Sequence, residues 1–185
     1  MNKGCTLIVG GARSGKSRFA QELAEKTRKA VLFVATAEAG DEEMSRRIEK
    51  HRKSRPAAWQ TLEATDNLSG RISREISGEG VVIIDCITLL VNNITRGHIN
   101  RGSEGIIEEQ VTAEIRGLIE CIDQTDARFI IVSNEVGLGL VPANKLGRFY
   151  RDILGRANQL LAQRADEVYL MVCGLPVAIK TPSRS

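Results

Sequence analysis

Short apolar runs rich in β-branched residues alternate along the chain with longer segments that have helical periodicity. The apolar runs occupy residues 7–9, 31–35, 81–84, 129–132 and 168–172. The helical patterns occupy residues 16–27, about 41–55, 104–122 and 145–165, and Pro56 ends the second of them. Short apolar runs separated by helices are typical of a parallel sheet covered on both faces. The pattern predicts an α/β fold with a mostly parallel central sheet.

Two of these helical segments carry apolar stripes, which predict the faces that they bury. In the segment 104–122 the stripe consists of Ile107, Val111, Ile115, Leu118 and Ile122. In the segment 145–165 it consists of Leu146, Phe149, Ile153, Ala157, Leu160 and Leu161.

The remaining segments complete the expected outline. Residues 177–180 follow Gly174, Leu175 and Pro176, so we expect them to fold back antiparallel on the last strand as a C-terminal hairpin. Residues 96–105 contain three glycines and are expected to form a flexible connection. A chain of 185 residues suits one buried core. We therefore expect a single domain over residues 1–180 and a disordered tail over 181–185.

The first apolar run leads into a complete Gly-x-x-x-x-Gly-Lys-Ser loop, residues 10–17, and then into the first helical segment. This context is the one in which the motif binds phosphate, because glycines and a helix N-terminus turn backbone N–H groups toward the anion. Lys16 would reach the β- and γ-phosphates, and the Ser17 hydroxyl would ligate Mg²⁺. The loop therefore predicts nucleoside triphosphate binding rather than an ordinary glycine turn.

Asp85 ends the apolar run 81–84. A carboxylate at the carboxyl tip of a core strand beside a phosphate loop is suited to hold Mg²⁺ or its water. Aspartate is also a good helix N-cap, so that interpretation stays open, although the upstream loop favours the metal role.

His51 lies in a basic segment and has two interpretations. It shares a helical stripe with Met44 and Ile48, which favours a buried histidine with a satisfied hydrogen bond. Six cationic side chains surround it in the sequence: Arg46, Arg47, Lys50, Arg52, Lys53 and Arg55. Their charge would keep the imidazole neutral and able to attack phosphorus. The residues alone leave both interpretations open.

Composition excludes several other classes of protein. The net charge of +3, from 26 basic and 23 acidic residues, is too small to argue for nucleic acid. No apolar stretch approaches the roughly 18 residues that cross a membrane, and the N-terminus lacks a signal peptide pattern. The four cysteines are scattered, which favours reduced thiols and a cytoplasmic location. Cys5, Cys86 and Cys173 are expected in or beside core strands as small hydrophobic residues.

A specific motif follows the fourth apolar run: residues 134–144 read Asn-Glu-Val-Gly-Leu-Gly-Leu-Val-Pro-Ala-Asn. Further matching stretches are residues 148–152, 155–159 and 165–168. With the loop 10–17, Ala35-Thr36 and residues 51–56, these stretches closely resemble the bifunctional adenosylcobinamide kinase / adenosylcobinamide-phosphate guanylyltransferase family of cobalamin biosynthesis. The resemblance runs from the first strand to Ile179-Lys180.

The resemblance implies two transferase reactions. In the first, ATP or GTP phosphorylates the aminopropanol hydroxyl of adenosylcobinamide. In the second, GTP transfers GMP to adenosylcobinamide-phosphate, which gives adenosylcobinamide-GDP and pyrophosphate. The family passes through a guanylylated histidine, and His51 is the matching residue; position 50, where histidine can also occur, is lysine here. The family also implies a homotrimer.

The same resemblance implies a set of site residues. Lys16 and His51 would be catalytic, and Ser17 and Asp85 would hold Mg²⁺. The nucleotide site would comprise Gly10, Gly11, Ala12, Arg13, Ser14, Gly15, Lys16, Ser17, Ala35, Thr36, Ala37, Arg52, Lys53, Ser54, Arg55, Glu63 and Asp85. We expect residues 134–144 to contact the corrin ring. The chain has no glycine-bounded lid of the small-nucleotide kinases, which favours a RecA-like form of the P-loop NTPase fold.

Other functions stay possible on the residues alone. A kinase without guanylyl transfer would keep the phosphate loop and Asp85 but would not need His51. A GTPase switch would need Asn-Lys-x-Asp, and the nearest match, residues 144–147, lacks the final aspartate. A nucleic-acid-dependent ATPase would use the basic segment, but interleaved aromatic residues are missing there.

Overall fold

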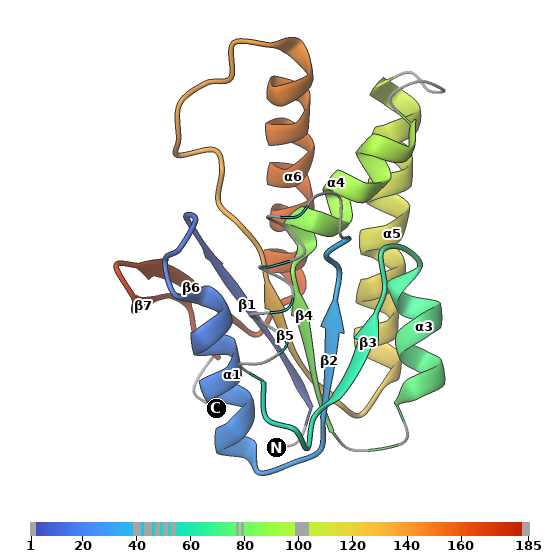
Figure 1. The fold of residues 1–185 in the computed structure, drawn as a ribbon, viewed down its shortest axis with the longest axis vertical. Helices are drawn as coiled ribbons and strands as arrows, with labels where there is room; N and C mark the ends of the chain where they lie inside the picture. The colour runs from blue at the N-terminus through green and yellow to red at the C-terminus, as the bar shows by residue number, and fades with distance from the viewer. Residues whose placement is uncertain are drawn as a thin grey trace.

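The computed structural model describes residues 3–38, 55–76, 78, 80–98 and 104–182, together with residues 42, 46, 49 and 52. Its strands form one seven-stranded sheet in the order β3-β2-β4-β5-β1-β6-β7 (Figure 1). Neighbouring strands are parallel except for the antiparallel pair β6–β7. The strands are β1 (Gly4–Gly10), β2 (Val31–Ala35), β3 (Gln60–Glu63), β4 (Val81–Asp85), β5 (Arg128–Val132), β6 (Glu167–Val172) and β7 (Leu175–Lys180). The predicted parallel sheet and C-terminal hairpin are confirmed.

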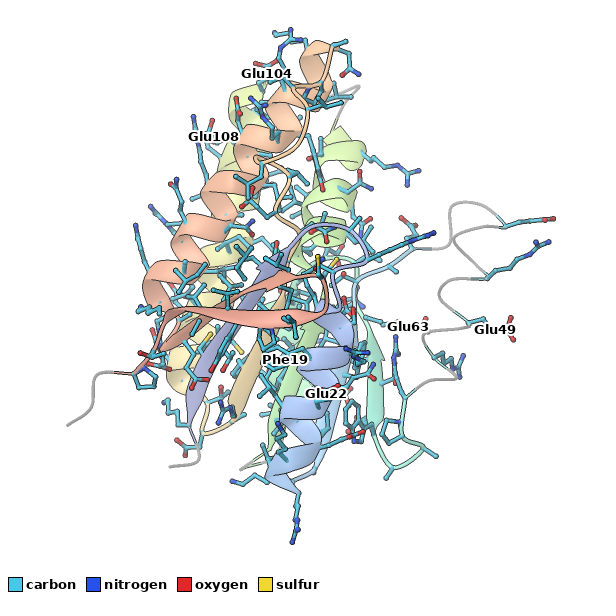
Figure 2. All side chains as sticks on the ribbon, turned by 90° about the vertical axis from the view of Figure 1, so that its left-hand side faces the viewer. Phe19, Glu22, Glu49, Glu63, Glu104 and Glu108 are labelled. Carbon is cyan, nitrogen blue, oxygen red and sulfur yellow. The ribbon has the colours of Figure 1, made fainter. Side chains whose placement is uncertain are left out.

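Helices cover both faces of this sheet. They are α1 (Lys16–Thr27), α3 (Leu68–Glu75), α4 (Ile87–His98), α5 (Glu104–Gln124) and α6 (Lys145–Arg164). Helix α1 packs on one face, where Ala20 and Ala24 join a core with Ile8 and Phe33. Helices α3, α5 and α6 pack on the other face in a larger core, so the sheet separates two apolar layers (Figures 1 and 2).

The pattern of the central strands reflects this double burial. Leu7 and Val9 belong to the core under α5 and α6, whereas Ile8 belongs to the core under α1. Successive side chains of a strand point to opposite faces, and both faces are apolar here, so the strands read as continuous apolar runs. All five residues of the predicted stripe on α5 are buried: Ile107, Val111, Ile115, Leu118 and Ile122.

Three elements were not expected from the sequence. Strand β3 is a short edge strand with mostly exposed residues, so it has no apolar run. Helix α3 buries only Leu68 and Ile72, too few for a periodic pattern. Only Cys86 separates the apolar strand β4 from helix α4, so the sequence shows no break between the two elements. Residues 96–98, predicted to be flexible, belong to α4.

Two single-residue predictions were wrong, the second of them in part. Leu146 was expected to face inward, but 46% of it is exposed, because the first turns of α6 extend beyond the edge of the sheet (Figure 1). Cys173 was expected in or beside a core strand as a small hydrophobic residue; it directly follows β6, but it lies exposed in the β6–β7 turn with a φ of 51°. In the described part of the chain, none of the helices is long and apolar enough to span a membrane.

Candidate nucleotide-binding site

The predicted phosphate loop connects β1 to α1 at the carboxyl edge of the sheet. Gly15 has a φ of 96°, which favours glycine, and it immediately precedes the first residue of α1. Lys16 is only 7% exposed, and its Nζ donates to the carbonyl oxygens of Gly10 at 3.0 Å and Gly11 at 2.7 Å. Burial lowers the pKa of Lys16, and the nearby carboxylate of Asp85 opposes this shift. The ammonium is therefore held in place at the centre of the loop.

The C-terminal hairpin supports this loop from behind. The Gly174 N–H donates to the carbonyl oxygen of Ser14 at 3.1 Å. A Cβ at Gly10 would lie 2.7 Å from the carbonyl oxygen of Met171, and a Cβ at Gly15 would lie 3.3 Å from Cα of Gly174. Strand β6 and its turn thus approach the loop so closely that glycine is required in the loop.

The loop opens on a cavity of about 440 Å³. Ten of the predicted site residues line it: Ala12, Arg13, Ser14, Gly15, Lys16, Ser17, Ala35, Ala37, Arg55 and Asp85. They come from the phosphate loop, from the carboxyl ends of β2 and β4, and from the segment before β3. Residues that are distant in the sequence therefore meet where the carboxyl ends of parallel strands reach one edge of the sheet.

Other predicted residues lie elsewhere. Thr36 is fully buried; its hydroxyl donates to the Cys86 carbonyl oxygen at 2.7 Å and accepts from the Cys86 N–H at 2.8 Å, which ties the ends of β2 and β4 together. Glu63 pairs in register with Ala35 and lies exposed at the edge of the sheet (Figure 2). Arg52 is helical and exposed. His51, Lys53 and Ser54 lie outside the described residues.

Among the described residues of the basic segment, Arg55 lines the cavity. Its guanidinium carbon lies 3.7 Å from the centre of the Phe33 ring, a cation–π contact that fixes the plane of the group. Its buried Nε has no hydrogen-bond partner within the described part of the chain. Burial lowers the pKa of Arg55, while Asp85 and Glu63 favour its charged form. A buried, unpaired guanidinium N–H in a cationic cavity is suited to bind a phosphate oxygen.

Asn134 also lines the cavity, at the carboxyl end of β5. Its backbone is held by side chains from two helices: its N–H donates to Thr88 Oγ1 at 2.7 Å, and its carbonyl oxygen accepts from Asn158 Nδ2 at 3.1 Å. Asn158 Oδ1 in turn accepts from the buried Ser133 hydroxyl at 2.6 Å. The corrin contact expected for residues 134–144 stays a prediction, and Asn134 was not among the residues predicted for the nucleotide site. Its place shortly after an apolar run was the available signal, as it was for Asp85.

The cavity contains the two expected magnesium ligands. The Ser17 hydroxyl and the Asp85 carboxylate both line it, beside the loop that would hold the phosphates. Mg²⁺ prefers oxygen ligands and is usually held by one or two protein groups together with substrate phosphates. The residues therefore fit a nucleotide-bound Mg²⁺.

Comparison with solved structures shows a RecA-like fold. The RadB recombinase aligns with a TM-score of 0.54 at 14% identity, covering 98% of this chain and 83% of that one. The flagellar accessory protein FlaH from Methanocaldococcus jannaschii aligns with a TM-score of 0.51 at 17% identity, covering 97% and 79%. At these identities the likeness concerns the fold alone.

Comparison with known sequences is more specific. The bifunctional adenosylcobalamin biosynthesis protein CobU of Escherichia coli (strain K12) is 41% identical over 179 residues, which cover 94% of this chain and 98% of CobU. CobP of Pseudomonas aeruginosa, described in the same words, is 42% identical over 174 residues, which cover 94% and 96%. Residues 6–179 match the family described as cobinamide kinase / cobinamide phosphate guanyltransferase. The nucleotide cavity and these matches together lead to one conclusion: the chain belongs to the cobinamide kinase / cobinamide phosphate guanyltransferase family.

Proposed function

We propose that this chain carries out both reactions of its family at the single cavity above the phosphate loop. As a member of the family, it is a bifunctional kinase and guanylyltransferase of adenosylcobalamin biosynthesis. The observation that carries the proposal is the convergence of Lys16, Arg55 and Asp85 on one cavity of about 440 Å³. Two cations and a carboxylate suited to hold Mg²⁺ in one cavity suit the charge of a triphosphate.

In the kinase step, the γ-phosphoryl group of ATP or GTP passes to the aminopropanol hydroxyl of adenosylcobinamide. Lys16 and Arg55 hold and orient the phosphates, while the loop amides bind the non-bridging oxygens. Ser17 and Asp85 would hold Mg²⁺, which would supply positive charge to the phosphates when bound with the nucleotide. The hydroxyl proton leaves as the new P–O bond forms and the bond to the nucleoside diphosphate breaks.

In the transfer step, His51 is the proposed nucleophile. Its imidazole nitrogen bonds to the α-phosphorus of GTP, and the bond to pyrophosphate breaks; the corrinoid phosphate then forms its bond to this phosphorus as the P–N bond breaks. The support comes from the family resemblance and from Arg55, which follows His51 by four residues and lines the cavity. Two displacements allow pyrophosphate to leave before the large corrinoid phosphate enters.

The proposal extends to the partners and the location. Adenosylcobinamide, its phosphate and the nucleotides ATP and GTP are the proposed substrates, with no nucleic acid. A homotrimer is proposed from the family resemblance, and a cytoplasmic location from the four free cysteines, of which Cys5, Cys86 and Cys121 are buried.

Labelled GTP tests the covalent step. The protein is incubated with Mg²⁺ and with GTP labelled at the α- or the γ-phosphate, then denatured and separated on a gel. We expect acid-labile, base-stable label from the α-phosphate only. His51→Ala should abolish it, and His98→Ala, which changes the other histidine of the chain, should retain it. Equal labelling of His51→Ala would exclude this residue, and no label from folded wild-type protein would favour the kinase-only alternative.

A further inference from the structure

A second cavity lies near the carboxyl edge of the sheet, on the face covered by α3, α4 and α5. It has a volume of about 660 Å³ and lies where the segment after β2 and helices α3, α4 and α5 meet. We call it the α3–α5 hollow. The residues that matter for its chemistry are Glu38, Asn67, Ser69, Asn93, Gln110 and Ala113. The space exists because α4 and α5 present small residues there, Gly97, Ala113 and Gly117.

The charge of the hollow is opposite to that of the nucleotide cavity. Cationic Arg13, Lys16 and Arg55 line the nucleotide cavity, whereas no lysine or arginine is among the described residues that line the hollow. Glu38 and Glu114 contribute carboxylates to it instead. A triphosphate is therefore repelled from the hollow, while a neutral or cationic ligand is favoured.

Two of the carboxylates already have structural partners. Glu114 accepts from the backbone N–H groups of Asn67 at 3.1 Å and Leu68 at 2.7 Å and so caps the N-terminus of α3. Asp66, which also lines the hollow, pairs with Arg71 at 2.9 Å. These contacts fix the walls of the hollow without using its other polar groups.

The remaining polar groups are suited to amides. The side chains of Ser69 and Gln110 make no hydrogen bond within the described part of the chain. The side-chain oxygen Oδ1 of Asn67 accepts from the Gly70 N–H, which leaves the side-chain NH₂ group of Asn67 as a donor. Asn93 donates through Nδ2 to the carbonyl oxygens of Thr36 and Thr65, which leaves its own carbonyl oxygen as an acceptor. Primary amides need both donors and acceptors, and the hollow offers both.

Consecutive residues of the chain line the two cavities, which share no lining residue among those that the structure describes. Ala37 lines the nucleotide cavity and Glu38 lines the hollow, and Cα atoms of neighbouring residues lie about 3.8 Å apart. Asn93 couples the two sites, because it lines the hollow and holds the backbone of Thr36, the residue before Ala37. The wall of the hollow is therefore continuous with the wall of the nucleotide cavity along residues 36–38.

We propose that the α3–α5 hollow binds amide side chains at the periphery of the corrinoid substrate and thereby delivers the aminopropanol arm to the nucleotide cavity. This inference rests on the proposed function. Cobinamide carries several primary amides around its ring, and its adenosylated cobalt(III) form has a net positive charge, which suits the carboxylates. The ring itself is too large for the hollow and stays outside it, so only the peripheral arms enter.

Two variants of α5 test the assignment. Ala113→Phe fills the hollow with an aromatic ring, and Gln110→Ala removes one amide partner. In kinase assays at saturating ATP, we expect Ala113→Phe to raise the KM for adenosylcobinamide about ten-fold, and Gln110→Ala about three-fold. Equilibrium dialysis of the corrinoid should show the same weakening. The KM for ATP and the kcat should stay within about two-fold of the wild type.

Matched controls lie on the same helix but do not line the hollow. Arg116→Phe and Glu109→Ala make comparable changes at exposed positions, and both should leave the corrinoid KM unchanged. Labelling from α-phosphate GTP without corrinoid measures whether each variant is folded and binds nucleotide. If Ala113→Phe and Gln110→Ala label normally and keep the wild-type corrinoid KM, the inference is wrong. Failure of the proposed function would differ, because the wild-type protein would then neither phosphorylate adenosylcobinamide nor take up label.

Discussion

At the scale of single residues, burial and electrostatics set the behaviour of the nucleotide cavity. Lys16 is buried against two carbonyl oxygens, and Arg55 stacks on Phe33 with an Nε that has no hydrogen-bond partner among the described residues. Burial lowers the pKa of both side chains, because it disfavours their charged forms. A bound triphosphate reverses this effect, since its negative charge favours the cations. Nucleotide binding and protonation of Lys16 are therefore linked.

This linkage gives a pH dependence with a definite sign. The pKa of Lys16 in the free protein lies below the ordinary 10.5, and bound nucleotide raises it. We expect affinity for ATP to be constant below the lowered pKa and to fall as the pH rises through it, with proton uptake on binding. Calorimetry at increasing pH in two buffers of different ionisation enthalpy measures both quantities. Lys16→Arg stays charged and should lose the dependence; the same slope in both proteins would contradict the prediction.

At the scale of elements, helix α6 is docked onto the end of β5 by a buried polar link. Ser133, at 0% exposure, donates to Asn158, which donates in turn to the backbone of Asn134. Asn158→Leu leaves the Ser133 hydroxyl and the Asn134 carbonyl without this partner, so we expect a loss of about 1–3 kcal/mol in the free energy of unfolding. The midpoint of urea unfolding measures this change. Gln159→Leu, at the exposed neighbouring position, should change it little, and equal effects of the two variants would contradict the prediction.

The elements differ in how far the sequence could predict them. Strands β1, β2, β4 and β5 are apolar on both faces, and their burial is visible in the sequence as continuous runs. Strand β3 lies at an edge and has no such run, because hydrogen bonds to β2 rather than side-chain burial hold it. The residues of strand β7 are also exposed, but Gly174 and Pro176 indicate a turn before it in the sequence.

At the scale of the whole molecule, the nucleotide site combines one contiguous segment, the phosphate loop, with residues that are distant in the sequence. The phosphate loop is contiguous, so its spacing alone predicts it. Arg55 lines the same cavity while it stacks on Phe33 of β2, and Asn134 lines it because β5 lies between β4 and β1. Such contacts depend on the order of strands in the sheet, which a single sequence does not encode in any local pattern. Asp85 could be predicted because a carboxylate at the carboxyl end of a core strand beside a phosphate loop is suited to hold Mg²⁺ or its water.

Strand β7, the last strand in the order of the sheet, carries exposed apolar side chains. Leu175, Val177 and Ile179 of β7 are 69%, 51% and 61% exposed. Strand β7 is an edge strand (Figure 1). Alternate residues of a strand share a face, so Leu175 and Val177 form an apolar row, and Ile179 follows them where the register with β6 shifts. Edge strands with such rows pair readily with another chain unless they are protected. The row is therefore a suitable contact for the proposed homotrimer.

A charge placed in this row should disrupt the assembly. We expect the wild-type protein to elute with a mass three times that of the 20.3 kDa chain, and Val177→Asp to shift it toward the monomer in size-exclusion chromatography with light scattering. The reason is that a carboxylate buried in an apolar interface is strongly unfavourable. Ala178→Asp places the same charge on the other face of β7 and should leave the mass unchanged. If Val177→Asp kept the wild-type mass, contacts elsewhere would hold the subunits together, and the exposed Leu138 and Leu140 would be the next positions to change.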